Sequence, residues 1–279
     1  MKIGILIPTF QAARHLPRCL PPLMASPLCP KILLIDSSST DGTVELAKKM
    51  GVESIVIPQS HFNHGTTREQ GRRLLNTPIT VMMTQDAYAA SPQMLTQLVE
   101  PIVNRQSSIS YARQLPHPGA GFLERFPREF NYPKEAHVRG LEDRSKFGSY
   151  IFFCSNSCAA YLSTALDEVG GFPPVLFGED TLVVAKLLHR GHRIAYAASA
   201  EVFHSHAHTL RQEFQRHFDI GLSRKKEEAF FNSIDDQKRG RAYVKAMVLA
   251  LLRENPLLLP YACLQLGAKF LGYRLGLFS

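Results

Sequence analysis

The chain has 279 residues, of which 45% are hydrophobic and 20% charged, a composition typical of a globular protein that can bury a core. Its formal charge of +8 and its 11 histidines favour a negatively charged partner, such as a nucleotide, a nucleic acid or an acidic membrane face. The sequence has no RNP-like aromatic motif and no C2H2 spacing, and its Lys and Arg residues are spread along the chain. We therefore expect no nucleic-acid partner.

Two features of the sequence predict a cytoplasmic protein. Only five apolar residues, Ile3 to Ile7, precede Pro8, which is too few for a signal-peptide core or a spanning helix. The five cysteines contain no CxxC pair, as expected in a reducing compartment.

The first hundred residues alternate between strand and helix patterns. Apolar runs predict strands over residues 2–8, 31–36, 52–58 and 79–87. Helices are predicted over 13–26, 40–51, 62–76 and 91–105, the last with Ser91 as its cap and Pro92 in its first position. This alternation predicts an α/β fold with a mostly parallel sheet flanked by helices.

The pattern changes after residue 110. Residues 111–150 lose periodicity and gain Pro, Gly and charge, which predicts a long functional loop or insertion rather than more core. Residues 151–172 then predict a strand and a helix, and residues 178–208 predict a helix and a further strand.

Two carboxylates follow buried strands at the same expected edge of the sheet. Asp36 ends the second strand, and Asp86 follows the apolar run that begins at Ile79. Ligands of parallel α/β sheets bind beyond the carboxyl ends of the strands, and acids are seldom buried without partners. We therefore expect both acids to serve a ligand.

Four short motifs lie at or near this edge: PTF (8–10), DSSSTDGT (36–43), TQDA (84–87) and GED (178–180). In this order they resemble the motifs of family-2 inverting glycosyltransferases of the GT-A fold. The resemblance implies a Rossmann-like GT-A catalytic domain over residues 1–210, with a nucleotide-binding half near 1–110 and an acceptor-binding half near 111–210.

A narrower resemblance concerns the sugar. The segments that carry it are FNHGTTREQG (62–71), TQDA, YARQLP (111–116), FNYP (130–133), GGF (170–172), HSH (204–206) and FDIG (218–221). Together they resemble bacterial rhamnosyltransferases of that family, which build O-antigen and other surface polysaccharides from a dTDP-activated sugar.

The resemblance implies a set of nucleotide-binding residues. Asp36 matches the family position that accepts the imide N–H of a pyrimidine, with Thr9 beside it, although Asp36 could instead cap the helix near residue 40. Arg68 matches an arginine that faces the base and diphosphate, or it is a solvated helix charge. The other nucleotide-binding positions are Pro8, Phe10, Gln85 and Asp86.

Asp86 also matches the last carboxylate of the family's DxD motif, which holds a divalent cation against the diphosphate. Such oxygen ligands suit Mg2+ or Mn2+. Thr84 and Gln85 occupy the other two positions of the motif, so a cation would need further ligands here.

The HSHAH segment offers such ligands. His204, His206 and His208 would point to one side of an extended chain, and a histidine just after the last strand is a metal ligand in related GT-A enzymes. We expect His204 or His206 to bind the metal. Surface histidines, an orienting role and a three-histidine zinc site are the alternatives.

Asp180 matches the family's catalytic base, which takes the proton of the acceptor hydroxyl as that hydroxyl attacks the anomeric carbon. Glu179 and Asp180 could also be a simple helix cap, a role compatible with catalysis. For the sugar or acceptor we expect Glu179, Asn156, Arg113 and Gln114, although the last two could belong to a loop that is merely packed.

Residues 211–279 read as a helical C-terminal extension. Its longest apolar stretch, residues 244–267, is interrupted by Arg253, Glu254, Asn255 and Pro256 and falls short of a spanning helix. Lys225, Lys226, Lys238, Arg239 and Arg241 precede it, so an amphipathic helix pair could lie on an anionic membrane. A helical hairpin on the catalytic domain and a homo-oligomer surface are equal alternatives.

The sequence thus predicts a cytoplasmic, metal-dependent inverting glycosyltransferase, for which a peripheral position at the inner face of the cell membrane is one alternative. It would move L-rhamnose from dTDP-L-rhamnose to a hydroxyl of a surface polysaccharide or lipid-linked glycan. A transferase that uses a UDP-hexose and a GT-A module that binds without turnover are the rivals. A sugar-phosphate nucleotidyltransferase would need a Gly-rich basic loop after the first strand, which PTFQAARH does not supply.

Overall fold

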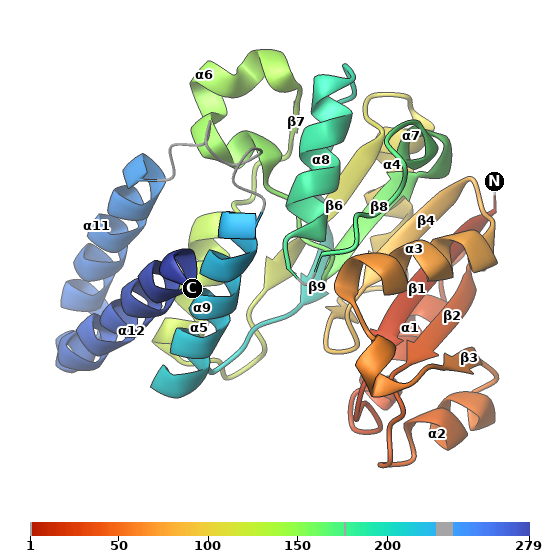
Figure 1. Ribbon diagram of the computed structural model, residues 1–279, viewed down its shortest axis with the longest axis horizontal. Coiled ribbons are helices and arrows are strands. Elements are labelled where there is room, and N and C mark those ends of the chain that lie inside the picture. Colours follow the sequence, from red (N-terminus) through yellow and green to blue (C-terminus); the bar gives the residue numbers. More distant parts are fainter. Residues whose placement is uncertain (1, 176, 227–236) are drawn as a thin grey trace. The chain divides into compact units, whose positions relative to one another are not determined.

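The N-terminal strands pair in parallel in the computed structural model, in the order β3-β2-β1-β4 (Figure 1). They are β1 (Ile3–Thr9), β2 (Lys31–Asp36), β3 (Glu53–Val56) and β4 (Ile79–Met83). The connecting helices are α1 (Leu16–Met24), α2 (Thr43–Lys49) and α3 (His64–Leu75). The alternation read from the sequence is therefore confirmed for this part of the chain.

The structure describes residues 2–175, 177–226 and 237–279, which fall into two compact units. The first unit consists of Met1–Leu115, Tyr132–Asp143 and Ile151–His204. The second consists of Pro116–Asn131, Arg144–Tyr150 and Ser205–Ser279.

Alternate residues of β1 face opposite sides of the sheet. Ile3, Ile5 and Ile7 pack in a core with α1, α2 and α4 (Met94–Val103). Leu6 points the other way, toward α3, where a side chain on Gly71 would lie 2.4 Å from it. Because Gly71 has no side chain, α3 lies directly on the strand, and its first residues reach the carboxyl edge of the sheet.

The sheet continues beyond β4 with mixed pairing, in the order β4-β8-β6-β9-β5. These strands are β5 (Tyr88–Ala89), β6 (Ile109–Leu115), β8 (Cys158–Leu162) and β9 (Ile194–Phe203), and β7 (His137–Arg139) pairs with β9. Helices α7 (Ser163–Glu168) and α8 (Glu179–His189) lie between β8 and β9 in the chain. The predicted α/β class, with a mostly parallel sheet flanked by helices, is confirmed.

The pairing of β6 with β9 contains a bulge. Ala112 pairs with Ala197, but the next residue, Arg113, pairs with Glu201. Residues 198–200 of β9 therefore have no partner on β6. Beyond the bulge the two strands run in register to Leu115 and Phe203.

The expectation of a long loop or insertion over residues 111–150 is wrong. The segment begins within β6, an inner strand, and contains α5 (Phe122–Asn131), β7 and α6 (Arg144–Phe147). Residues 109–112 are all buried, the polar Ser110 included, so this strand shows no alternation of buried and exposed residues. A strand that is covered on both faces does not show the alternation of apolar and polar residues by which a half-exposed strand is recognised.

The start of α4 also differs from the prediction. The helix begins at Met94 with Gln93 in the cap position, not with Ser91 as cap and Pro92 as its first residue. The carbonyl of Ser91 accepts a hydrogen bond from the N–H of Met94, so these residues form a turn before the helix.

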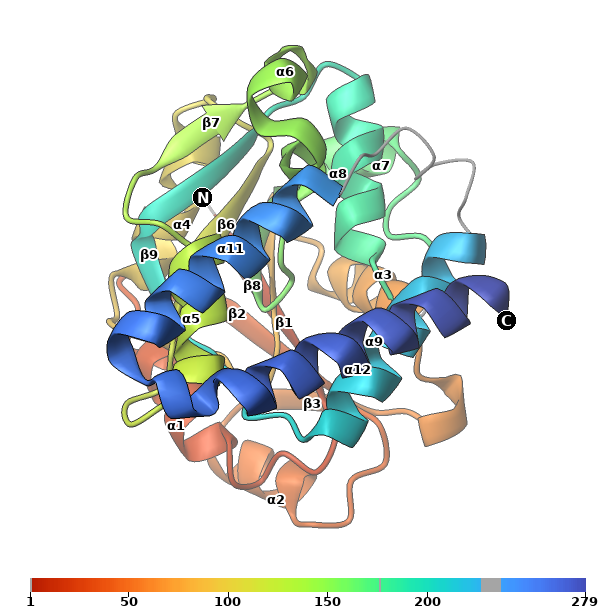
Figure 2. The same ribbon diagram turned by 90° about the vertical axis from the view of Figure 1, so that its left-hand side faces the viewer.

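The second unit is helical, as predicted for the C-terminal part of the chain, with α9 (Leu210–Lys226), α11 (Gln237–Glu254) and α12 (Leu259–Phe278) (Figure 2). Residues 227–236 of the predicted helical tail lie outside the described residues. An apolar cluster joins α5, α11 and α12 through Phe122, Phe126, Met247, Leu251 and Ala262. Among the described residues, no helix combines the length and the apolar character needed to cross a membrane.

Helices α9 and α12 lie side by side in the same direction, with glycines at their contact (Figure 2). A Cβ on Gly272 would lie 2.2 Å from the carbonyl oxygen of Phe214, and a Cβ on Gly276 would lie 2.1 Å from that of Phe218. The missing side chains let the two backbones approach closely, so the glycines set the distance between the helices.

We expect Gly276→Ala to lower the free energy of unfolding by about 1–3 kcal/mol, because the added methyl group must displace backbone atoms of α9. The matched control is Gly267→Ala in the same helix, where nothing lies within 4 Å of the added group. That change should raise stability by about 0.5–1 kcal/mol through helix propensity. Chemical denaturation measures both, and equal stability of the two variants would contradict the close contact.

Candidate functional site

A cavity of about 530 Å³ lies where β1, β2 and β4 end. It is lined by six of the seven residues predicted to bind a nucleotide, which are Pro8, Thr9, Phe10, Arg68, Gln85 and Asp86. Its volume falls within the range of about 300–1,000 Å³ that is usual for ligand pockets. The carboxyl edge of a parallel sheet is where such folds bind ligands, so this cavity is the candidate site.

Three polar atoms of the cavity lining are buried without a hydrogen-bond partner. They are the Oγ of Ser37, the Oγ1 of Thr84 and the Nε of Arg68, from β2, β4 and α3 respectively or the turns that follow them. A buried polar group that lacks a partner costs free energy, and three around one cavity indicate a ligand that supplies the missing bonds.

Asp36 does not line the cavity. It is fully buried, and its carboxylate accepts hydrogen bonds from the Thr9 hydroxyl at 2.8 Å, the Ser39 hydroxyl at 2.7 Å and the Ser39 N–H at 2.8 Å. These bonds use three of the roughly four acceptor positions of a carboxylate. The role of Asp36 in reading a base stays a prediction, and it is the next residue, Ser37, that faces the cavity.

Gln85 fastens the end of β1 to the turn after β4. Its Oε1 accepts from the N–H of Phe10 at 2.8 Å, and its Nε2 donates to the carbonyl of Phe10 at 3.0 Å. This pair of bonds fixes the backbone of Phe10, a residue that lines the cavity and is 40% exposed. Gln85 therefore shapes the cavity through main-chain contacts.

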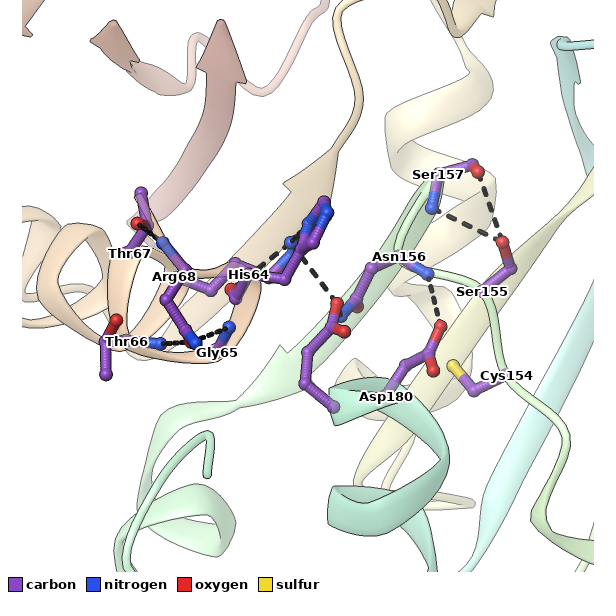
Figure 3. A network of polar contacts seen from close by, with 12 residues as sticks. His64, Gly65, Thr66, Thr67, Arg68, Cys154, Ser155, Asn156, Ser157 and Asp180 are labelled. Carbon is purple, nitrogen blue, oxygen red and sulfur yellow. Dashed lines mark hydrogen bonds and ion pairs between the residues drawn. The ribbon is translucent and has the colours of Figure 1, made fainter. Parts of the chain in front are cut away.

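Arg68 connects the cavity to a second group of polar residues (Figure 3). Its Nη1 lies 3.2 Å from the Oε1 of Glu179, and both side chains are almost fully buried. The same nitrogen lies 3.0 Å from the Nδ1 of His64, one turn earlier on α3. The alternative of a solvated helix charge is thus excluded for Arg68 by its burial.

Asn156 holds the two acids at the start of α8. Its side-chain Nδ2 donates to the Oε1 of Glu179 at 2.9 Å, and its backbone N–H donates to the Oδ2 of Asp180 at 3.2 Å (Figure 3). The amide is fixed in turn by Tyr161, whose hydroxyl donates to the Asn156 Oδ1 at 2.8 Å. The position of each carboxylate is therefore set by contacts from β8 and the loop before it.

The pKa values of the two acids are shifted in opposite directions. Burial raises the pKa of Asp180 to about 6, and the charge of Glu179 adds to this effect. Burial alone would also raise the pKa of Glu179, but the Arg68 charge, the His64 charge and the Asn156 hydrogen bond bring it below its usual value. One carboxylate is thus held ionised beside another whose affinity for a proton is increased, a pattern typical of acid–base sites.

Asp86 and His204 lie together in the first unit, with 3.5 Å between the aspartate Oδ1 and the histidine Nε2. The Nδ1 of His204 lies 2.9 Å from the Oε1 of Gln114, whose Nε2 donates to the Ser155 hydroxyl at 2.9 Å. Since Gln114 can only accept through that oxygen, the proton of His204 belongs on Nδ1 and the lone pair of Nε2 faces Asp86. This tautomer is the one that a metal ligand needs.

The remaining predicted residues lie as follows. Gln114 is buried and orients His204, while Arg113 forms an ion pair with Glu201 at 2.7 Å and donates to the carbonyl of Tyr132 at 3.3 Å. His206 belongs to the second unit, where its ring stacks on that of His208 with the centroids 5.0 Å apart.

The sequence reasoning missed several residues of the site. Ser37 and His64 line the cavity, as does Phe62, and Tyr161 fixes Asn156. The signals were present but ambiguous. Ser37 follows a recognised acid in a run of three serines, and Phe62 and His64 stand in FNHG beside the arginine that was recognised.

A cavity at the carboxyl edge of an α/β sheet, linked to a pair of carboxylates whose pKa values are shifted in opposite directions, is typical of the active site of an enzyme. Residues 4–170 match the family model described as "Glycosyl transferase family 2". The chain belongs to glycosyl transferase family 2, which confirms the resemblance read from the four motifs.

Two curated relatives match over most of the chain. The O-antigen chain rhamnosyltransferase RfbN of Salmonella typhimurium is 36% identical over 99% of this chain and 90% of its own length. The O-antigen chain rhamnosyltransferase WbaN of Salmonella anatum is 36% identical over 88% of this chain and 79% of its own length. The narrower resemblance, to rhamnosyltransferases, is confirmed by these two relatives.

A solved structure shows the same fold at low identity. The mannosyltransferase PcManGT from Pyrobaculum calidifontis, in complex with GDP-Man and Mn2+, superposes with a TM-score of 0.65. The match covers 99% of this chain and 85% of that chain, with 14% of residues identical.

The raised pKa of Asp180 predicts the effect of Asp180→Asn on stability. Above pH 6 the carboxylate is ionised in both states, and the shift from 3.8 to about 6 destabilises the folded state by up to about 3 kcal/mol. The asparagine avoids this cost, so the variant should unfold at a higher temperature than the parent at pH 7.5. Below about pH 3, under both pKa values, both states bind the proton, and the difference should vanish.

Thermal unfolding across this pH range measures the effect, with the exposed Glu100→Gln as the matched control. The control should change stability by less than about 0.5 kcal/mol at every pH. A destabilised Asp180→Asn variant at pH 7.5 would contradict the raised pKa.

Proposed function

We propose that the protein is an inverting rhamnosyltransferase that moves L-rhamnose from dTDP-L-rhamnose to a hydroxyl of a surface polysaccharide or lipid-linked glycan. Two relatives that are 36% identical over most of the chain are O-antigen chain rhamnosyltransferases, which supports both the sugar and the class of acceptor. We further propose that residues 1–210 form the catalytic domain and that the enzyme works in the cytoplasm, at the inner face of the membrane.

The cavity is the proposed donor site. The rings of Phe10 and Phe62 offer apolar surface for the base. The hydroxyls of Ser37 and Thr84 and the Nε of Arg68 can donate hydrogen bonds to base carbonyls or diphosphate oxygens, which would satisfy three atoms that otherwise lack partners. Thr9 also lines the cavity, and its hydroxyl is held by a hydrogen bond to the buried carboxylate of Asp36.

The observation that carries the proposal is the double role of Arg68. Its side chain lines the donor cavity and is also ion-paired with Glu179, the neighbour of Asp180. A base next to the donor site is what an inverting transfer requires. Asp180 accepts the proton of the acceptor hydroxyl, the hydroxyl oxygen bonds to the anomeric carbon, and the bond from that carbon to the diphosphate breaks on the opposite face.

A raised pKa suits Asp180 to this role. A carboxylate with a pKa of about 6 is mostly ionised at neutral pH, yet it holds a proton more strongly than an ordinary aspartate does. Glu179 and Asn156 position this base, while Arg113 and Gln114 remain proposed neighbours of the sugar or acceptor.

Asp86 and His204 fit a divalent cation, Mg2+ or Mn2+. Their facing oxygen and nitrogen are suitable ligand atoms, and Gln114 fixes the histidine tautomer that such a role needs. We propose His206, two residues further along the chain, as a third ligand. The cation would neutralise charge on the departing diphosphate, and a solved structure of the same fold contains Mn2+.

The first experiment follows release of nucleoside diphosphate from dTDP-L-rhamnose, UDP-glucose, UDP-galactose and UDP-N-acetylglucosamine. We expect turnover of dTDP-L-rhamnose, and Asp180→Asn should lower kcat by about 10²–10⁴-fold while leaving dTDP affinity within a few-fold. The parent's activity should fall as the pH drops below about 6, because the base must be ionised to accept a proton.

Turnover of a UDP-sugar instead would overturn the rhamnose assignment but keep the mechanism. If no donor turns over, calorimetry with dTDP shows whether the cavity still binds a nucleotide. Binding without turnover would favour the rival hypothesis of a GT-A module that does not catalyse transfer. Full activity of Asp180→Asn would rule out its role as the base.

The metal proposal has a test that does not depend on turnover. Asp86→Asn and His204→Gln should each weaken Mn2+ binding, measured by calorimetry in the presence of dTDP, by about 10-fold or more. The exposed Glu45→Gln is the matched control and should bind Mn2+ like the parent. Unchanged Mn2+ affinity in both site variants would contradict the proposed ligands.

A further inference from the structure

Helix α12 presents a continuous apolar stripe. Tyr261, Leu264, Leu271, Leu275 and Phe278 follow one another at intervals of three, seven, four and three residues, which places them on one face of the helix. Each is between 41% and 70% exposed. Single exposed apolar residues are ordinary, but a stripe along a whole helix indicates an interaction surface.

This stripe differs from the face that α12 turns toward α9. That contact is made by Gly272 and Gly276, which are buried against the backbone of α9. Lys269 borders the same contact and lies 3.3 Å from the carboxylate of Glu213 on α9. The stripe therefore takes no part in the contact between α12 and α9 and stays exposed.

Helix α11 combines charge and apolar surface on one face. Lys238, Arg241, Lys245, Leu249 and Leu252 follow at intervals of three, four, four and three residues, and all five are exposed (Figure 2 shows the helix). The three cations occupy the first turns and the two leucines follow. A helix with this pattern suits the interface of an anionic membrane.

The charge balance of this region is one-sided. Residues 237–279 contain seven Lys and Arg residues and one acid, Glu254, which gives 7 − 1 = +6 of the chain's formal charge of +8. The carboxylate of Glu254 is paired with Arg125. The exposed faces of α11 and α12 thus offer cations and apolar side chains without a matching supply of carboxylates.

We propose that these exposed faces of α11 and α12, the α11–α12 face, dock on an anionic lipid bilayer. Anionic headgroups would pair with the three cations of α11, and the boundary between headgroups and acyl chains would take up the apolar stripe of α12. A second copy of the chain fits less well, because the three cations of one copy would meet those of the other, and the one acid among residues 237–279, Glu254, is already paired with Arg125. The inference goes beyond the reaction and does not depend on which sugar is transferred.

The test is flotation of the full-length protein with vesicles of phosphatidylcholine, alone or mixed with phosphatidylglycerol. The protein should float with the mixed vesicles, and added salt should release it. The triple change Lys238→Glu, Arg241→Glu and Lys245→Glu should reduce the partition coefficient by about 10-fold or more. The double change Leu264→Gln and Leu271→Gln should have an effect of similar size, about 10-fold.

Matched controls come from the first unit. Lys48→Glu with Lys49→Glu reverses exposed charges on α2, and Leu74→Gln with Val103→Gln removes exposed apolar side chains from α3 and the end of α4. Both controls should float like the parent, and thermal unfolding should show that every variant is folded. Affinity for dTDP should be the same in all of them.

Three results would overturn the proposal. One is equal flotation with neutral and anionic vesicles, and another is unchanged flotation of both α11–α12 variants. The third is a stable dimer in sedimentation velocity that the double leucine variant dissociates, without vesicle binding by the parent. That result would assign the face to a second copy.

Discussion

The buried ion pair between Arg68 and Glu179 joins the two chemical halves of the site. It connects α3, which lines the cavity, to the first residue of α8, where Asp180 follows. Both side chains are almost fully desolvated, so the loss of either partner would leave a charge buried without compensation, a change that typically costs about 3–5 kcal/mol. The pair therefore constrains how far the donor cavity can lie from the proposed base.

Glu179, a member of this pair, and the next residue, Asp180, are both acids, but their carboxylates differ in affinity for a proton. Glu179 receives a cation and an amide donor, whereas Asp180 receives two backbone donors, a long hydrogen bond from the Thr181 hydroxyl and the repulsion of its neighbour. Asn156 reaches both carboxylates, one through its side chain and one through its main chain. The local arrangement reduces the stability of the fold in exchange for a carboxylate that binds protons more strongly, as functional sites often do.

Much of the fold could be predicted because its signals are local. Apolar runs and helix caps repeat along the first hundred residues, and four motifs stand at the ends of elements, so the sheet edge and most of the cavity lining were found. The direction of a side chain at a strand end is not local, which is why Asp36 rather than Ser37 was expected to face the ligand. Gln114 was assigned to a loop because a strand buried on both faces gives no alternation, and its contact with His204 spans 90 residues of sequence.

The bulge on β9 separates the register of the first part of the strand from the register of its end. One step along β6, from Ala112 to Arg113, corresponds to four steps along β9, from Ala197 to Glu201, so the intervening residues do not disturb the pairs that follow. The contact between His204 and Gln114 lies beyond the bulge and depends on the pairing that resumes there. A change of length within 198–200 should therefore leave the histidine beside Gln114, which makes the bulge a spacer that isolates the end of the strand from the register of its first half.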